Sequence, residues 1–148
     1  MTTFREAAVP WSATRPEPHS DRVWVVDDEP AAADLAVEMC ELAGLEAIAF
    51  GTAGSYLDVL RGASSPAMVI LDWRLEHELS AALFMATRQR YPTLPVLFWT
   101  GSERGSLPLM VHHDPHVRIL AKAGGSAEFS AALAWALTDG AAPSAPAD

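Results

Sequence analysis

The chain has a single cysteine, no long apolar run and few basic side chains. Cys40 cannot form an internal disulfide, and its apolar neighbours predict a buried, unreactive thiol. No segment reaches the roughly 18 apolar residues of a membrane span, and no basic start with an apolar run opens the chain. The formal net charge is -9 and the ten Lys and Arg residues are scattered, which argues against binding to a nucleic-acid backbone. We therefore expect a cytoplasmic protein with neither membrane nor nucleic acid as a direct partner.

The chain does have the apolar material for one sizeable core. Half of its 148 residues are hydrophobic, and the length is too small to suggest two ordinary domains. Residues 1–20 contain three prolines and are predicted to form an extended arm. Residues 140–148 are small and lack periodicity, which predicts a disordered tail. One globular domain is expected over 21–139.

Short apolar runs alternate with helix-like stretches in this domain. The runs of strand length cover 23–26, 47–50, 67–71, 95–99 and 117–121. Because they are continuous rather than alternating, they predict strands buried on both faces of a parallel sheet. Strict alternation with helices predicts an α/β fold in which a five-stranded, doubly wound parallel sheet carries helices on both faces.

Helix signals lie between these runs. Pro30 suits the first turn of a helix that runs to about residue 42, where Gly44 stops it, and Thr52 is the expected N-cap of the next helix. Ser80 is the expected cap of a third helix. The segment 102–116 contains glycine and prolines, so any helix there should be short. The expected apolar helix faces are Leu35, Met39 and Leu42; Tyr56, Leu57 and Leu60; Leu83, Phe84 and Thr87; and, in a last helix over about 127–138, Phe129, Leu133, Ala136 and Leu137.

Four of the predicted strands lead directly to a polar residue. Asp27 and Asp28 follow the first strand, Asp72 the third, Thr100 the fourth and Lys122 the fifth. The carboxyl ends of parallel strands meet at one edge of a sheet, where ligands bind in open α/β folds. Crowded carboxylates need a cation, and hard oxygen ligands select Mg²⁺. A carboxylate, a hydroxyl and an ammonium around such an ion suit phosphoryl transfer, which depends on positioning and charge.

The chain resembles the receiver domain of response regulators in two-component signalling, over about 21–139. The stretches that carry the resemblance are VWVVDDEP, VILDWRL, LFWTGS and LAKA, and 44 residues separate Asp28 from Asp72 and 22 separate Thr100 from Lys122. The resemblance implies a single flavodoxin-like (CheY-like) domain with strand order 2-1-3-4-5. It also implies a phosphoprotein of a phosphorelay that signals through protein contacts rather than an enzyme.

The resemblance further implies a role for each site residue. Asp72 would accept the phosphoryl group from a histidine kinase or a histidine phosphotransfer protein. Asp28 and Asp72 would bind Mg²⁺ directly and Asp27 through water, with the Arg74 main-chain carbonyl as a further ligand. The phosphoryl group would contact Thr100 and Lys122. Side chains at Arg74 and Ser102 occupy positions that tune the lifetime of the phosphate.

Several positions depart from the family's pattern. Ala123 follows Lys122 where a proline is usual, while Glu76 and Ser80 replace a usual proline and glycine. Ile119 stands where the family places an aromatic switch residue, so that it lacks both hydroxyl and aromatic bulk. These changes leave the phosphorylation chemistry intact and leave open how phosphate would alter the surface.

Two other functions stay open. The departures from the family's pattern favour a pseudo-receiver that binds partners independently of phosphate. Such a domain would not need the complete set of Asp27, Asp28, Asp72, Thr100 and Lys122. An Mg²⁺-dependent phosphohydrolase with an aspartyl-phosphate would need a second aspartate two residues after the first, but position 29 is glutamate. Homodimer formation is possible in any of these cases.

Two secondary features have plain structural explanations. His112, His113 and His116 lie near Asp114, but Pro115 interrupts a helix that would align them, so a solvated loop is expected instead of a metal site. Trp135 lies off the apolar face of the last helix. It either marks an exposed surface for a partner or packs along the flank of the core.

Overall fold

The computed structural model describes residues 22–62, 64–74, 80–102 and 104–140. Its sheet consists of β2 (Arg22–Val26), β3 (Glu46–Phe50), β4 (Met68–Leu71), β5 (Val96–Thr100) and β6 (Val117–Ala121). All neighbouring strands pair in parallel, in the order β3-β2-β4-β5-β6. Counted from the first described strand this is 2-1-3-4-5, which confirms the predicted topology.

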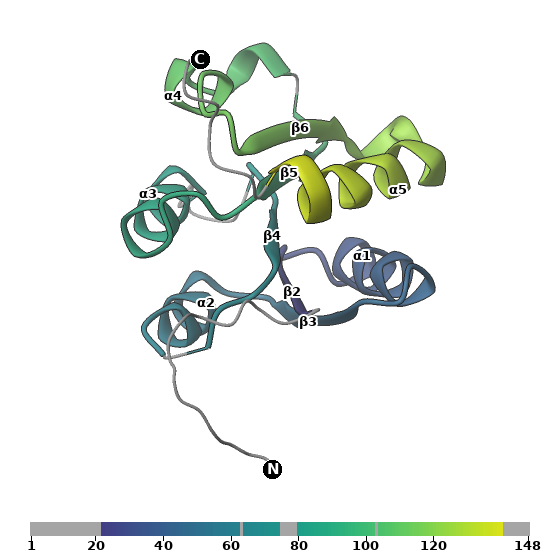
Figure 1. Ribbon diagram of the computed structural model, residues 1–148, viewed down its shortest axis with the longest axis horizontal. Helices are drawn as coiled ribbons and strands as arrows, with labels where there is room; N and C mark the ends of the chain where they lie inside the picture. Colours follow the sequence, from purple (N-terminus) through teal and green to yellow (C-terminus); the bar gives the residue numbers. More distant parts are fainter. Residues whose placement is uncertain (1–21, 63, 75–79, 103, 141–148) are drawn as a thin grey trace.

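Helices cover both faces of the sheet (Figure 1). The main ones are α1 (Pro30–Leu42), α2 (Ala53–Leu60), α3 (Ser80–Arg90), α4 (Leu109–His112) and α5 (Ser126–Trp135). One core lies between the sheet and α1 and α5, and the other between the sheet and α2, α3 and α4. A short 3₁₀ turn, η2 (Arg104–Ser106), follows β5, and another, η3 (Lys122–Gly124), precedes α5. A π turn, η4 (Ala136–Gly140), ends the described chain.

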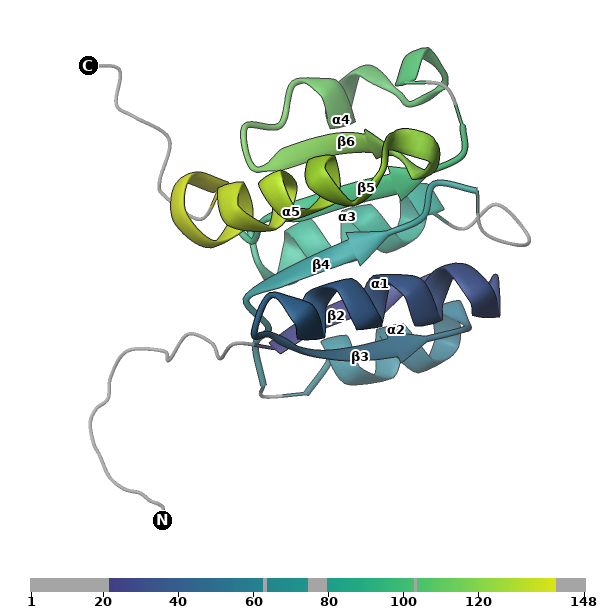
Figure 2. The ribbon, with the colours of Figure 1, turned by 90° about the vertical axis from the view of Figure 1, so that its right-hand side faces the viewer.

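The central strands are apolar because both of their faces are covered. Every residue of β4 and β5 is buried, as are the last four residues of β2. The outer strands β3 and β6 are only partly buried. Figure 2 shows that the strand arrows point to the same side of the molecule, so the residues that follow β2, β4, β5 and β6 share one edge.

The predicted start and stop of α1 and the predicted N-cap of α2 are confirmed. Pro30 opens α1, the Thr52 side chain accepts a hydrogen bond from the Ser55 backbone N–H (3.1 Å), and Gly44 follows α1 with a φ of 87°. This φ lies in the left-handed region, which glycine adopts without steric cost. As predicted, the helix between β5 and β6 is short.

The predicted apolar face of α1 is wrong at Leu35 and Leu42, whereas Met39 is half-buried and packs against the core as predicted. The buried residues are Ala32, Ala33, Ala36 and Cys40, whereas Leu35 is 46% exposed and Leu42 is 81% exposed. Small side chains let α1 approach the sheet closely, so the helix rotates its larger apolar residues outward. Cys40 is buried as expected, and burial, followed by repulsion from Glu41, raises the pKa of its thiol to about 12.

The other helix faces agree with prediction except at the C-terminus. Tyr56, Leu60, Leu83, Phe84, Thr87, Phe129, Leu133 and Ala136 are buried. Leu137 is 41% exposed because α5 ends at Trp135 and the chain continues in the π turn. Ser80, expected as the cap of the third helix, is instead the first residue of α3, and its hydroxyl donates to the Asp72 carbonyl (2.9 Å) and the Trp73 carbonyl.

Parts of the prediction fall outside the described chain. The arm over 1–20, the tail over 140–148 except its first residue, and Glu76 are among them. Across the ranges that the structure covers, no helix is both long and apolar enough for a membrane crossing.

A buried hydroxyl pair joins α2 to α3. The Thr87 hydroxyl donates to the Leu83 carbonyl (2.7 Å), so the Tyr56 hydroxyl is the donor in the 2.6 Å contact with Thr87. Replacing Tyr56 by phenylalanine removes this hydrogen bond without changing the ring, and should lower the free energy of unfolding by about 1 kcal/mol. Urea titration of both proteins measures this difference, and an unchanged midpoint would contradict it.

Candidate functional site

Pairing of β2 with β4 places two aspartates side by side. Val26 and Leu71 are paired residues at the ends of these strands, so Asp27 and Asp72 follow at the same level. The Asp27 backbone N–H donates to the Phe50 carbonyl (3.2 Å), and the Asp72 N–H donates to the Val26 carbonyl (3.1 Å). These hydrogen bonds fix both residues at the sheet edge.

The two aspartates use their carboxylate oxygens in the same way. Asp27 Oδ1 accepts the backbone N–H of Glu29 (3.0 Å), and Asp72 Oδ1 accepts the backbone N–H of Arg74 (3.2 Å). Each local turn orients its carboxylate and leaves Oδ2 directed elsewhere. Asp27 and Asp72 are buried, and Asp28 beside them is half-buried.

The three aspartates form one compact cluster. An oxygen atom from each of Asp27, Asp28 and Asp72 lies within 4.8 Å of the others. Among the residues that the structure describes, this is the one group of three or more histidine, cysteine or acidic side chains close enough to hold a metal ion. The sequence prediction that these carboxylates converge is therefore confirmed as geometry.

Lys122 provides the positive charge of the cluster. Its Nζ lies 2.9 Å from Asp27 Oδ2 and 3.3 Å from Asp72 Oδ2, and 3.4 Å from Oε1 of the exposed Glu29. The β5–β6 register pairs Thr100 with Ala121, which brings Lys122 to the same edge. The predicted meeting of Lys122 with Asp72 is thus present.

Burial and the attraction between Asp27 and Lys122 have opposite effects on the pKa of each group. Burial raises the pKa of Asp27 and repulsion from Asp72 adds to this, and together they outweigh the hydrogen bonds from Lys122 and Glu29. Burial alone would lower the pKa of Lys122, but Asp27 and Asp72 outweigh it and raise the pKa. Lys122 is therefore held as a cation between carboxylates that are partly uncompensated.

Thr100 lies at the end of β5 and is 1% exposed. Its Oγ1 accepts the backbone N–H of Ser102 (3.1 Å), so the hydroxyl hydrogen can be donated elsewhere. The Ser102 hydroxyl is buried and has no hydrogen-bond partner within the described chain. Each hydroxyl therefore has a hydrogen available for donation at the carboxyl end of β5.

The cluster fits a divalent cation. Three aspartates against one ammonium leave a surplus of two negative charges, and all available ligand atoms are hard oxygens. Asp27, Asp28 and Asp72 are the side chains that could hold Mg²⁺ there. Ligation by the Arg74 carbonyl stays a prediction.

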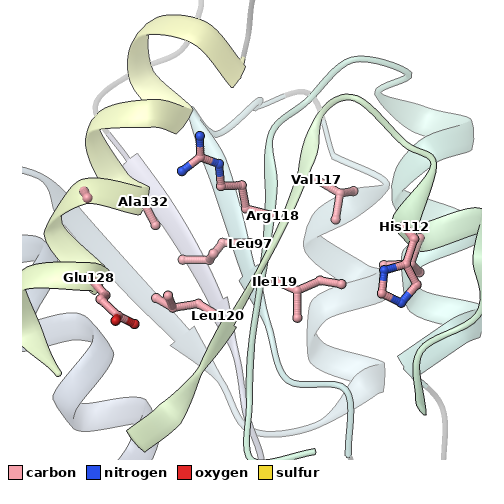
Figure 3. A pocket seen from close by; sticks show the side chains of 10 residues that line it. Leu97, His112, Val117, Arg118, Ile119, Leu120, Glu128 and Ala132 are labelled. Carbon is pink, nitrogen blue, oxygen red and sulfur yellow. The ribbon is translucent and has the colours of Figure 1, made fainter. Parts of the chain in front are cut away.

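Ile119 lies outside this cluster, on edge strand β6. It is half-buried and packs against the core on the α4 side. A cavity of about 480 Å³ lies along β6. In Figure 3, Ile119 extends toward His112, while Leu120 extends toward Glu128 of α5. A role of Ile119 or Ser102 in regulation stays a prediction.

The three histidines near Asp114 and Trp135 of α5 have structural explanations. His112 and His113 are exposed on and after α4, whereas His116 is buried before β6, so the three do not share one environment. Trp135 is half-buried, packs against the core and lies under the Arg118 guanidinium at 5.0 Å from the ring centroid. Of the two alternatives for Trp135, the flank contact is the one the structure contains.

Sequence reasoning missed one neighbour of Lys122. The Trp99 side chain, part of the strand predicted over 95–99, lies beneath the ammonium, with 5.5 Å between Nζ and the ring centroid. The one sign of this contact in the sequence is the position of Trp99, directly before Thr100 in the same strand. Whether an indole on one strand reaches a lysine on the next depends on rotamers that the sequence does not encode.

Comparison with known proteins identifies the fold. No family model matches the chain, and no curated protein matches it. Solved structures do match: a response regulator receiver protein from Sinorhizobium medicae WSM419 has a TM-score of 0.69 and 19% identity over 80% of this chain and 95% of that chain.

Two further structures agree. A receiver domain protein from Clostridium thermocellum has a TM-score of 0.71 and 18% identity, over 80% of this chain and 94% of that chain. A CheY-like receiver domain protein from Methanospirillum hungatei JF-1 has the same TM-score, identity and coverage. The chain therefore has the fold of response-regulator receiver domains.

Proposed function

We propose that the chain is a response-regulator receiver whose Asp72 accepts a phosphoryl group with the help of Mg²⁺. The observation that carries this proposal is the edge where three aspartates lie within 4.8 Å of one another and share a single lysine. An acidic cluster that shares one lysine on this fold suits phosphoryl transfer, which depends on positioning and on compensation of negative charge. The protein then acts as a signalling domain and not as an enzyme.

Each residue has a defined part in the transfer. A carboxylate oxygen of Asp72 attacks phosphorus, the new P–O bond forms as the P–N bond of a donor phosphohistidine breaks, and the electron pair stays on the imidazole nitrogen. Lys122, already near Asp72, compensates the negative charge of the transferring oxygens. Thr100 donates its hydroxyl hydrogen to a phosphoryl oxygen.

Mg²⁺ would be held by Asp28 and Asp72 directly, with Asp27 acting through water and the Arg74 carbonyl as a further ligand. When bound, it neutralises charge on the phosphoryl oxygens. The ordered turns at Asp27 and Asp72 hold the carboxylates in place before any ligand arrives. The donor is a histidine kinase or histidine phosphotransfer protein, and output runs through protein contacts.

Incubation with acetyl phosphate and Mg²⁺ tests the proposal. Intact mass spectrometry should detect one added phosphoryl group on the wild-type protein, and no addition when Mg²⁺ is chelated or when Asp72 is replaced by asparagine. Asp34→Asn, an exposed acidic residue of α1, is the matched control and should be modified like the wild type.

Other outcomes select the alternatives. No adduct on the folded wild-type protein would favour a phosphate-independent interaction module. An adduct that persists in Asp72→Asn would exclude Asp72 as the acceptor. Repeated turnover of a small phosphate ester would favour a phosphohydrolase.

A further inference from the structure

Trp99 is fixed in the core directly beneath the acidic site. It lies on β5 and is 4% exposed. Its ring meets Phe129 of α5 edge-on, with centroids 5.2 Å apart and planes at 80°. Since successive strand residues face opposite sides, Trp99 faces the α1 and α5 layer. The indole therefore has little freedom to turn.

Lys122 rests on this ring. The β5–β6 register pairs Trp99 with Leu120, two residues before Lys122, so the lysine stem can fold back over the indole. Nζ lies 5.5 Å from the ring centroid, within the range of a cation–π contact. The ammonium is thus placed between a fixed aromatic face and the carboxylates of Asp27 and Asp72.

The loop that follows Lys122 consists of small residues. Lys122 opens the three-residue turn η3, and Ala123, Gly124 and Gly125 follow it. Gly125 has a φ of 93°. Strand pairing fixes the backbone only as far as Ala121, so the position of the ammonium depends on the contacts of the Lys122 side chain.

We propose that Trp99 is the positioning residue for Lys122. This inference rests on the proposed phosphoacceptor function, because it states how the ammonium is kept within reach of Asp72. The carboxylate of Asp27 is the nearer of the two aspartates and draws the ammonium toward itself. The Trp99 ring limits that movement and keeps Nζ beside both carboxylates when the charges around it change.

The geometry can be tested without phosphorylation. Lys122 is the only lysine of the chain, so protein labelled with ¹³C,¹⁵N-lysine gives signals from one side chain. Protons above an aromatic face are shifted upfield, so the Lys122 ε-methylene signals should lie upfield of those of a solvated lysine. Trp99→Leu should abolish this shift and Trp99→Phe should retain part of it.

Trp135→Leu is the matched control. It also removes an indole that lies under a basic side chain, Arg118, but at the outer flank of α5. It should leave the Lys122 signals unchanged. A wild-type protein without the upfield shift, or an equal change in Trp135→Leu, would overturn the proposal.

Phosphorylation kinetics test the consequence. With acetyl phosphate and Mg²⁺, Trp99→Leu should react about fivefold more slowly than Trp135→Leu at equal folded fraction, and Trp99→Phe should recover most of the rate. Equal rates for Trp99→Leu and Trp135→Leu, or no recovery in Trp99→Phe, would refute a positioning role.

The two hypotheses fail in different ways. If no variant and no wild-type protein takes phosphate while the Lys122 shift is present, the phosphoacceptor function fails and the contact stands. If Trp99→Leu does not fold, the wild-type shift and its reduction in Trp99→Phe decide the question.

Discussion

Replacing Lys122 by alanine is expected to slow phosphorylation of Asp72 by about a hundredfold. The ammonium is the only basic group in contact with the Asp72 carboxylate among the described residues, at 3.3 Å. Without it, negative charge on the transferring oxygens would be met by the metal ion and hydroxyls alone. The rate of adduct formation with acetyl phosphate, followed by intact mass, measures this effect.

The same variant should be unstable without metal. Asp27 and Asp72 keep only 3% and 7% of their side-chain surface exposed, so losing Lys122 leaves two buried carboxylates uncompensated. Removing one partner of a buried ion pair in this way costs about 3 kcal/mol. Mg²⁺ should restore much of the loss, because a ligand that binds only the folded state stabilises it.

Two controls separate this effect from a general loss of contacts. Glu29→Gln removes the exposed partner of Lys122 and should change stability by less than about 1 kcal/mol. Asp27→Asn combined with Lys122→Ala should be more stable than Lys122→Ala alone. If Lys122→Ala were as stable as the wild type in chelator, the ammonium would not be compensating buried charge.

Arg88→Met is expected to lower the free energy of unfolding by about 3 kcal/mol or more. Arg88 of α3 donates to both carboxylate oxygens of Asp114, at 2.6 and 3.1 Å. Its guanidinium also donates to the carbonyls of Tyr91, Leu94 and His116. The variant keeps the apolar stem and leaves the half-buried Asp114 carboxylate and three carbonyls without this donor. Urea titration measures the loss.

Arg88→Lys should recover little of it, because an ammonium cannot reproduce the planar fork that holds two carboxylate oxygens. A stability of Arg88→Met near that of the wild type would show that the ion pair and its hydrogen bonds contribute nothing net.

The ion pair also predicts a pH dependence. Burial would raise the pKa of Asp114, but hydrogen bonds from Arg88 and the His116 backbone outweigh it and lower the pKa below its ordinary value of 3.8. A carboxyl group whose pKa is lower in the folded state stabilises the fold above its unfolded pKa, and this stabilisation disappears as the pH falls through the folded pKa. Asp114→Asn should therefore lose stability at neutral pH and show a weaker acid dependence than the wild type.

The sheet and the acidic site were accessible from the sequence for one physical reason. In a parallel sheet, strand ends share an edge, so polar residues directly after apolar runs converge whatever their separation in the chain. Asp27, Asp72 and Lys122 meet as that rule requires. Thr100 follows from the same rule, since it ends the strand next to β6.

Which side of each helix faces the sheet was harder to predict from the sequence. Hydrophobic periodicity selects the largest apolar residues of α1, yet close packing on the sheet favours Ala32, Ala36 and Cys40. The exposed Leu42 is the consequence. Contacts between side chains on different elements, such as Trp99 with Lys122, depend on rotamers and register that periodicity does not specify.

The most direct test of the account is the position of the acyl phosphate. Reduction of the phosphorylated protein with borohydride converts a phosphoaspartate to homoserine, and peptide mass spectrometry then locates it. The account predicts homoserine at position 72 alone, formed only when Mg²⁺ was present. Homoserine at position 27 or 28, or none in a folded protein treated with acetyl phosphate and Mg²⁺, would contradict it.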